Sequence, residues 1–435
     1  EDCTGCGVCL DQCPANKNPE KQALTWSTIE KEVEACELEN EKFFDALPDN
    51  VMGRNTTKTM KGAMLRKPLF EFSGACAGCG ETPYVKLVSQ LFGENSIIAN
   101  ATGCSSIYSG TFPTIPYTKT KEGRGPAWAN SLFEDNAEFG YGMRLAVDQN
   151  RSTLKSFVEK VIENDKTPAD LKEALEGAMA HFDNSKTEEA IAAQTKAKEV
   201  LAKYADVECP DIAKVRELQD YFTDKSVWII GGDGWANDIG YGGIDHVLAQ
   251  NKNVNILVLD TEVYSNTGGQ ASKSTPTGAV AKFATGGKKT YKKNMGLMSM
   301  SYGYVYVASV ALGADRGQTL KAFQEAEAYN GPSIIFAYAP CIAHGIDMSK
   351  TQTEQKRAVE AGYFPLYRYN PANEQPFTWD AKDPKGSYQD FIRSERRYKS
   401  LAKTNPDNAE ALFAQAEEDA AKRMAVFKSV GELIK

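Results

Sequence analysis

The chain is 435 residues long, and 50 lysines and arginines against 58 aspartates and glutamates give it a formal net charge of −8. This acidic balance argues against broad binding to nucleic acids or anionic membranes. No apolar run approaches the roughly 20 residues that cross a bilayer, and no signal peptide opens the sequence, so a cytoplasmic protein is expected. Three histidines offer little material for a zinc hydrolase or a serine triad.

A dense cysteine motif opens the chain. Cys3, Cys6, Cys9 and Cys13, with Pro14 after them, form the pattern CxxCxxCxxxCP, which binds [4Fe–4S] clusters in bacterial-type ferredoxins. By this spacing Cys3, Cys6 and Cys9 share one cluster, and Cys13 serves a second cluster. The motif is therefore half of a two-cluster site.

The remaining chain changes character at about Pro68. Before it the sequence is polar, with one expected helix over TWSTIEKEVEACELE. After it, helical patterns alternate with apolar segments that we interpret as buried strands: SIIANATGCSS, SVWIIGGDGW, VNILVLDTEVY, YVYVASVAL and PSIIFAYAPC. This alternation predicts an α/β fold with a mostly parallel sheet covered on both faces. Composition predicts an inserted helical hairpin at about 152–204 and an amphipathic helix at 408–435.

A second set of cysteines lies within this α/β region and comprises Cys76, Cys79, Cys104 and Cys341. The CxxC pair of GACAGCGETPY fits a redox dithiol or half of a zinc site. Cys104 and Cys341 each follow a predicted strand, at the edge where open parallel sheets build their sites. Four thiolates at that edge predict one more iron–sulfur cluster, with a four-cysteine zinc site as the alternative. Cys36 and Cys209 have no partner spacing and are interpreted as ordinary cysteines.

Two glycine-rich loops follow neighbouring predicted strands, GGDGWANDIGYGG at 231–243 and LDTEVYSNTGGQ at 259–270. Gly232, Asp233 and Gly234 occupy a strand-to-helix turn whose backbone amides can face a phosphate group. Asp233 suits a magnesium ion shared with phosphate oxygens, and Thr261 and Asn266 could complete its shell. The two loops together resemble the diphosphate-binding signature of thiamine-dependent enzymes, which is GDG with an asparagine further downstream.

The segment GGKKTYKK contains Lys288, Lys289, Lys292 and Lys293. A run of this kind is usually a solvated surface. The alternative is a docking or phosphate-contact patch.

Together these motifs resemble the C-terminal portion of the pyruvate:ferredoxin oxidoreductases. The resemblance covers essentially the whole chain and rests on five segments in the family's order: GACAGCGETPY, ATGCSS, GGDGWANDIGYGG, LDTEVYSNTGGQASKSTPTG and YAPCIAHG. It implies a thiamine diphosphate-binding domain at 61–435, preceded at 1–60 by the C-terminal half of a two-cluster ferredoxin-like α+β domain. The other half of that domain is then expected upstream of Glu1, so the chain is expected to be a fragment or one subunit of a split enzyme.

The resemblance also implies roles for individual residues. The second cysteine set would hold the [4Fe–4S] cluster proximal to thiamine, which removes the zinc alternative. Asp233, Thr261 and the carbonyl of Val263 would bind Mg²⁺, and Asn266 would be the catalytic residue on the substrate side of the cofactor. The implied thiamine diphosphate contacts are Glu81, Cys104, Gly232, Asp233, Gly234, Trp235, Thr261, Glu262, Val263, Tyr264, Ser265 and Asn266.

The function implied is the oxidative decarboxylation of pyruvate with coenzyme A to acetyl-CoA and CO2. Electrons would pass through three [4Fe–4S] clusters to ferredoxin or flavodoxin, in a homodimer. Residues that activate thiamine and bind pyruvate belong to the family's N-terminal region, so this chain alone is not expected to turn over. One alternative is another 2-oxoacid:ferredoxin oxidoreductase, acting on 2-oxoglutarate or an indole pyruvate. The other is a non-catalytic iron–sulfur carrier, which the presence of Asp233, Thr261 and Asn266 disfavours.

Overall fold

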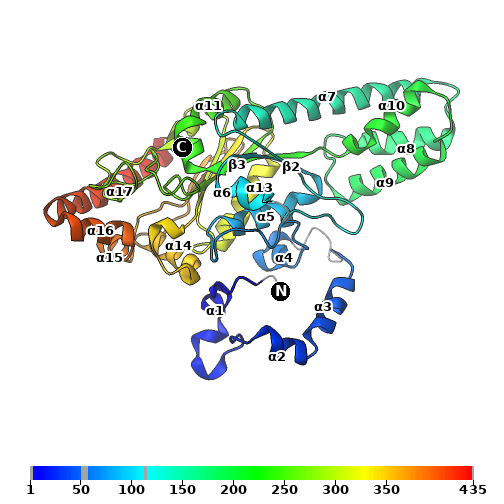
Figure 1. The fold of residues 1–435 in the computed structure, drawn as a ribbon. Helices are drawn as coiled ribbons and strands as arrows, with labels where there is room; N and C mark the ends of the chain where they lie inside the picture. Colours follow the sequence, from blue (N-terminus) through cyan, green and yellow to red (C-terminus); the bar gives the residue numbers. More distant parts are fainter. Residues whose placement is uncertain (1–2, 50–56, 112–114, 434–435) are drawn as a thin grey trace.

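The computed structural model describes residues 3–49, 57–111 and 115–433. Within these residues the centre is an eight-stranded sheet in the order β2-β1-β3-β4-β6-β5-β7-β8 (Figure 1). The strands are β1 (Ser96–Ala101), β2 (Ala127–Ser131), β3 (Ser226–Gly232), β4 (Asn255–Asp260), β5 (Tyr306–Val310), β6 (Ser333–Tyr338), β7 (Tyr367–Tyr369) and β8 (Phe377–Trp379). The pairs from β2 to β5 are parallel, and β7 and β8 add an antiparallel edge. The predicted α/β fold with a mostly parallel sheet is confirmed.

The segments predicted as strands form β1, β3, β4, β5 and β6, and their side chains alternate between two cores. Ile230 and Leu257 face one core, and Ile229 and Ile256 face the other, as the two-residue period of a strand requires. Every residue of β4 and β6 is buried because helices cover both faces. The prediction did not include β2, whose residues are all at least partly exposed, or β7 and β8, which have three residues each and show no clear period.

Helices cover both faces of the sheet. One face carries α4 (Met60–Met64), α5 (Thr82–Phe92), α6 (Cys104–Gly110) and α13 (Arg316–Ala328). The other face carries the start of α7 (Asn136–Glu163), α11 (Tyr241–Ala249), α12 (Met295–Met300) and the end of α17 (Pro406–Leu433), which is the helix expected at the C-terminus. A third core joins the rest of α17 to α14 (Thr351–Glu360), α15 (Tyr388–Ile392) and α16 (Arg396–Thr404).

A helical extension projects from the body on the second half of α7, together with α8 (Ala169–Ala180), α9 (Glu188–Lys203) and α10 (Pro210–Leu218) (Figure 1). It has a core of its own and is larger than the hairpin expected at 152–204. Helix α7 begins before residue 152, because Gly140 does not interrupt it. A Cβ at Gly140 would lie 2.4 Å from Ile229, so this glycine lets α7 pack closely on the sheet. No helix of the described ranges combines the length and apolarity that spanning a membrane takes.

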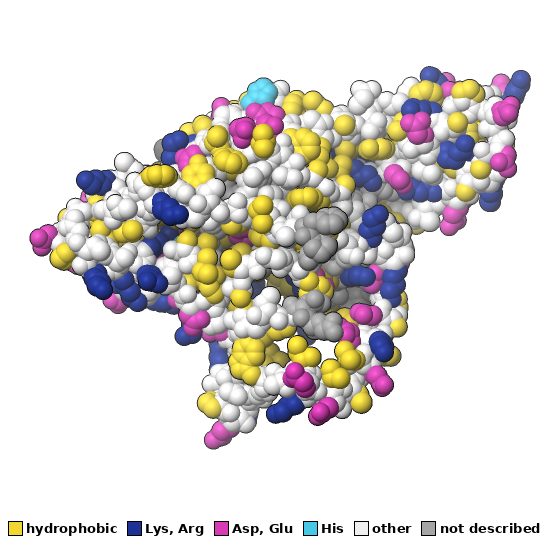
Figure 2. Space-filling view, viewed as in Figure 1, with side chains coloured by type: hydrophobic (Ala, Val, Ile, Leu, Met, Phe, Trp, Pro, Cys, Tyr) yellow, Lys and Arg dark blue, Asp and Glu magenta, His cyan; other side chains and the backbone are white. Residues whose placement is uncertain are grey.

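The N-terminal residues form an arm apart from this body, with α1 (Val8–Gln12), α2 (Ile29–Glu34) and α3 (Glu37–Ala46) (Figure 1). None of the residues in these helices is buried. The helix expected over TWSTIEKEVEACELE is divided at Cys36, whose φ is 65°. Hydrophobic side chains lie exposed along the arm (Figure 2), including Trp26, Phe43 and Phe44. The arm contacts the body where Asp11 and Gln12 of α1 meet Thr353 of α14.

Candidate functional site

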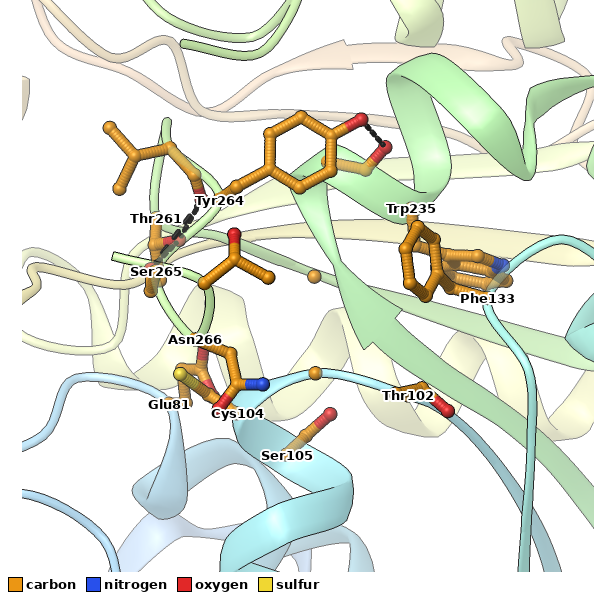
Figure 3. A pocket seen from close by; sticks show the side chains of 15 residues that line it. Glu81, Thr102, Cys104, Ser105, Phe133, Trp235, Thr261, Tyr264, Ser265 and Asn266 are labelled. Carbon is orange, nitrogen blue, oxygen red and sulfur yellow. Dashed lines mark hydrogen bonds between the residues drawn. The ribbon is translucent and has the colours of Figure 1, made fainter. Parts of the chain in front are cut away.

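A pocket that is partly open to solvent lies at the carboxyl ends of β1, β3 and β4. The side chains around it converge on a common space (Figure 3). Its lining is Glu81, Thr102, Gly103, Cys104, Ser105, Phe133, Gly232, Gly234, Trp235, Thr261, Val263, Tyr264, Ser265, Asn266 and Thr267. The contacts inferred from the sequence therefore line the pocket, except Asp233 and Glu262. Thr102, Gly103, Ser105, Phe133 and Thr267 were missed, although most of them adjoin a predicted residue.

Asp233 lies directly behind the pocket and is completely buried. Its Oδ1 accepts hydrogen bonds from the backbone N–H of Thr261 at 3.2 Å and from Thr261 Oγ1 at 2.9 Å. Thr261 Oγ1 is also 3.1 Å from the carbonyl oxygen of Val263. One hydroxyl hydrogen cannot serve both acceptors. Ser272 Oγ donates to the second carboxylate oxygen of Asp233 at 2.6 Å.

This cluster of oxygens fits a magnesium ion. Octahedral Mg²⁺ holds its ligands at about 2.1 Å, which leaves neighbouring ligand atoms about 3.0 Å apart. The distances from Thr261 Oγ1 to Asp233 Oδ1 and to the Val263 carbonyl, 2.9 and 3.1 Å, match two such edges. Burial, with the nearby charge of Asp260, raises the pKa of Asp233 to about 8. A divalent cation would compensate that buried carboxylate.

The second cysteine set gathers beside the same pocket. Cys104 is the first residue of α6, Cys79 precedes α5, and Cys341 follows β6. Burial raises the pKa of the Cys104 thiol, and Glu81, Cys341, Cys79 and Cys76 raise it further. Buried thiols become thiolates only beside positive charge, and an iron–sulfur cluster supplies it.

Backbone amides and one hydroxyl surround these sulfurs. The N–H of Glu81 is 3.5 Å from Cys79 Sγ, and that of Ala343 is 3.4 Å from Cys341 Sγ. Cys341 Sγ is 3.5 Å from Ser265 Oγ, which is 2.8 Å from Thr261 Oγ1. Ser265 therefore connects the cysteine set to the oxygen cluster. Within residues 3–49, 57–111 and 115–433, no three His, Cys, Asp or Glu side chains surround a position for a single metal ion.

The cysteines of the N-terminal motif lie on the arm, around α1. Gly5 and Gly7, with φ of 66° and 78°, turn the chain on either side of Cys6. The N–H of Gly5 is 3.4 Å from Cys3 Sγ. These sulfurs are exposed or half-buried, and they form a separate feature from the pocket.

Glu81 occupies the N-cap position of α5, without a capping bond from its side chain, and lines the pocket while being only 4% exposed. Its Oε2 has no hydrogen-bond partner among the described residues. Burial raises the pKa of its carboxyl group to about 7. Buried polar atoms in proteins are nearly always paired, so this orphaned oxygen fits a site that receives a ligand with a donor group.

The turn between β3 and α11 is shaped by its glycines. It contains a π-helical turn, η6 (Trp235–Ile239), closed by a 2.8 Å bond from the N–H of Gly240 to the carbonyl of Trp235. A Cβ on Gly234 would lie 2.5 Å from the ring of Tyr264, whereas a Cβ on Gly232 would meet nothing within 4 Å. Gly234 therefore permits close packing, and Gly232 leaves the pocket open.

Glu262 does not reach the pocket, although the sequence placed it among the cofactor contacts. Its side chain turns inward, where Lys292 Nζ and Arg397 Nη2 each lie 2.8 Å from its carboxylate. The lysine run was expected to be a solvated surface, but of its four lysines only Lys289 is exposed. Lys292 is buried, Lys288 donates to backbone carbonyls at 2.5 and 2.9 Å, and Lys293 lies over the ring of Tyr241.

The chain is similar in sequence to known proteins. The family model of the thiamine pyrophosphate enzyme, C-terminal TPP binding domain, matches residues 213–337. Pyruvate:ferredoxin oxidoreductase of Moorella thermoacetica is 56% identical over 99% of this chain and 37% of its own length. Pyruvate-flavodoxin oxidoreductase of Nostoc sp. is 50% identical over 98% of this chain and 36% of its own length. The chain thus spans little more than a third of these curated relatives.

A solved structure, 2-oxoglutarate:ferredoxin oxidoreductase from Magnetococcus marinus with 2-oxoglutarate, coenzyme A and succinyl-CoA bound, is also similar. It covers 68% of this chain and 70% of its own, with 15% identity and a TM-score of 0.38. That likeness is too distant to support an argument about this chain.

Proposed function

We propose that this chain belongs to the pyruvate:ferredoxin and pyruvate-flavodoxin oxidoreductase family, on the strength of its identity to those proteins, and that it is the part of such an enzyme that binds thiamine diphosphate and carries electrons away from it. The complete protein then converts pyruvate and coenzyme A to acetyl-CoA and CO2 and reduces ferredoxin or flavodoxin. The observation that carries the proposal is that Cys104 lines the same pocket as the oxygen cluster around Thr261.

The described residues divide into two groups with different tasks. Asp233, Thr261 and the Val263 carbonyl would hold Mg²⁺, and the turn at 232–235 would hold the diphosphate. When bound, thiamine diphosphate supplies the electron sink for cleaving the bond to the carboxylate carbon. Asn266 lines the pocket with an amide that can orient the substrate.

The second cysteine set would hold the proximal [4Fe–4S] cluster, next to the cofactor. Electron transfer out of the pocket would then start over a short distance. Cys3, Cys6 and Cys9 would share a second cluster and Cys13 a third, completed by residues elsewhere in the whole protein. All ten cysteines are free, as expected in a reducing cytoplasm. The family resemblance separately implies a homodimer.

Viologen reduction by the intact, anaerobically prepared protein tests the proposed reaction. Pyruvate and coenzyme A together should give rapid reduction, and omission of either should leave only a slow residual rate. 2-Oxoglutarate or an indole pyruvate in place of pyruvate tests the related 2-oxoacid oxidoreductases. No reduction with any of these substrates, from protein with full iron and thiamine content, would contradict the assignment. Absence of thiamine would favour the non-catalytic carrier.

Alanine at the two neighbouring glycines should separate cofactor binding from folding. Gly232→Ala should leave the free energy of unfolding nearly unchanged, because its methyl group meets nothing within 4 Å, yet weaken thiamine diphosphate binding by filling the pocket. Gly234→Ala should destabilise the fold by about 1–3 kcal/mol, because its methyl group overlaps Tyr264. Calorimetric titration and thermal unfolding measure the two effects. Equal effects of both variants on stability would contradict this division.

A further inference from the structure

Glu262 lies between two of the proposed magnesium ligands, Thr261 and Val263, in an unusual backbone conformation. Its φ is 61°, in the left-handed region that residues with a side chain rarely adopt. The turn at Glu262 leaves Thr261 Oγ1 and the Val263 carbonyl oxygen 3.1 Å apart. A strained residue of this kind persists only when its surroundings hold it in place.

The carboxylate of Glu262 is held by three donors. Lys292 Nζ is 2.8 Å from Oε1, Arg397 Nη2 is 2.8 Å from Oε2, and the hydroxyl of Tyr363 donates to Oε2 at 2.5 Å. Glu262 is 1% exposed, and its three partners are buried as well. Water therefore cannot replace any of these contacts.

The backbone of Glu262 is fixed at both of its polar groups. Its N–H donates to Asp260 Oδ1 at 3.2 Å, and its carbonyl accepts from Thr275 Oγ1 at 2.5 Å. Lys292 bridges Asp260 Oδ2, at 2.8 Å, to the Glu262 side chain. The same lysine thus supports both the backbone and the carboxylate.

Arg397 brings a distant part of the chain into this network. It belongs to α16, and its Nε donates to Glu395 Oε2 at 2.6 Å while Nη2 reaches the Tyr363 hydroxyl at 2.9 Å. Its carbonyl accepts from the N–H of Val280 at 3.1 Å. A guanidinium with this many fixed contacts has one orientation, which makes it suited to hold another group in place.

We propose that Arg397 and Lys292 are positioning residues for the divalent-cation site. By clamping the Glu262 carboxylate they keep residue 262 in its left-handed conformation, which turns the Thr261 hydroxyl and the Val263 carbonyl toward Asp233. The inference rests on the proposed function, since it concerns the same cation. It adds that ion pairs outside the pocket set the affinity for that cation. Without these ion pairs, the binding of the cation would itself have to supply the free energy that holds residue 262 in its left-handed conformation.

The test uses Mn²⁺ as the probe, measured by electron paramagnetic resonance in the intact protein with thiamine diphosphate present. Arg397→Met should raise the Kd for Mn²⁺ by about tenfold or more. Arg368→Met is the matched control, because Arg368 is also buried and paired, with Glu325 at 2.7 Å and Asp380 at 2.9 Å. It should lower thermal stability and leave the Kd for Mn²⁺ unchanged.

A rescue experiment separates positioning from general support of the fold. Adding Glu262→Gly to Arg397→Met removes the carboxylate that has lost its arginine partner, and glycine adopts a φ of 61° without strain. The Kd should return to within about threefold of the wild type, whereas a merely structural role predicts no recovery. If Arg397→Met does not fold, Tyr363→Phe removes a single donor and should raise the Kd by about threefold.

The outcomes distinguish the two levels of the proposal. Wild-type protein that binds no Mn²⁺ would overturn both the proposed function and the positioning role. Wild-type protein that binds Mn²⁺, with Arg397→Met or Tyr363→Phe binding equally well, would overturn the positioning role alone. Arg368→Met weakening Mn²⁺ binding as much as Arg397→Met would overturn it too.

Discussion

Cys104→Ala should abolish the electron paramagnetic resonance signal of the proximal cluster and leave the two ferredoxin-type signals in place. Cys104 lines the pocket and shares its surroundings with Cys79 and Cys341. A cubane cluster needs a ligand at each of its corners, so its loss should remove about four iron atoms per chain. Viologen reduction should fall by more than about a hundredfold. Iron analysis and spectroscopy of the anaerobic intact protein measure both effects.

Cys36→Ser is the matched control for that experiment. Cys36 is exposed on the arm between α2 and α3, outside both cysteine sets. Its replacement should change neither the iron content nor any cluster signal. A proximal signal that survives Cys104→Ala would contradict the ligand assignment, and an unaltered thiamine content would exclude general damage to the pocket.

Sequence reasoning located the parts of the site that follow directly from strand order. Cys104, Asp233, Thr261 and Cys341 each come shortly after an apolar strand. Parallel strands bring their carboxyl ends to one edge, so position along the chain already gives position in space. The structure brings these four residues to that edge, although they come from four different strands.

The direction of a side chain depends on packing and was not predictable. Glu262 lies in the same exit loop as Thr261, but its backbone conformation turns its side chain to the opposite side. Lys292 belongs to a run that resembles a solvated surface, yet it is buried against Asp260 and Glu262. Nothing near Arg397 in the sequence marks its partner, because that contact arises only when α16 packs beside the β4 exit loop.

Asp233→Asn should stabilise the protein without the cofactor and nearly abolish the further stabilisation that the cofactor gives. Without ligand at pH 7, the variant of this chain should be more stable than the wild type by about 2 kcal/mol, because it no longer buries a carboxyl group with a raised pKa. Asparagine keeps the acceptor for Thr261, so the packing is retained. Added Mg²⁺ and thiamine diphosphate should stabilise the wild type by about 2.7 kcal/mol at a hundred times the Kd, and the variant hardly at all.

The pH dependence of this difference follows from the same carboxyl group. Because folding raises the pKa of Asp233, the folded wild type binds more protons than the unfolded chain, and its stability falls as pH rises from about 4 to about 8. The advantage of Asp233→Asn without ligand should therefore shrink as the pH falls toward 4 and be smallest below that, where the group is protonated in both states. Asp238→Asn, at a carboxylate in the same turn paired with Lys273, should still gain stability from the cofactor. Equal stabilisation of Asp233→Asn and wild type by Mg²⁺ and thiamine diphosphate would show that Asp233 is not a ligand.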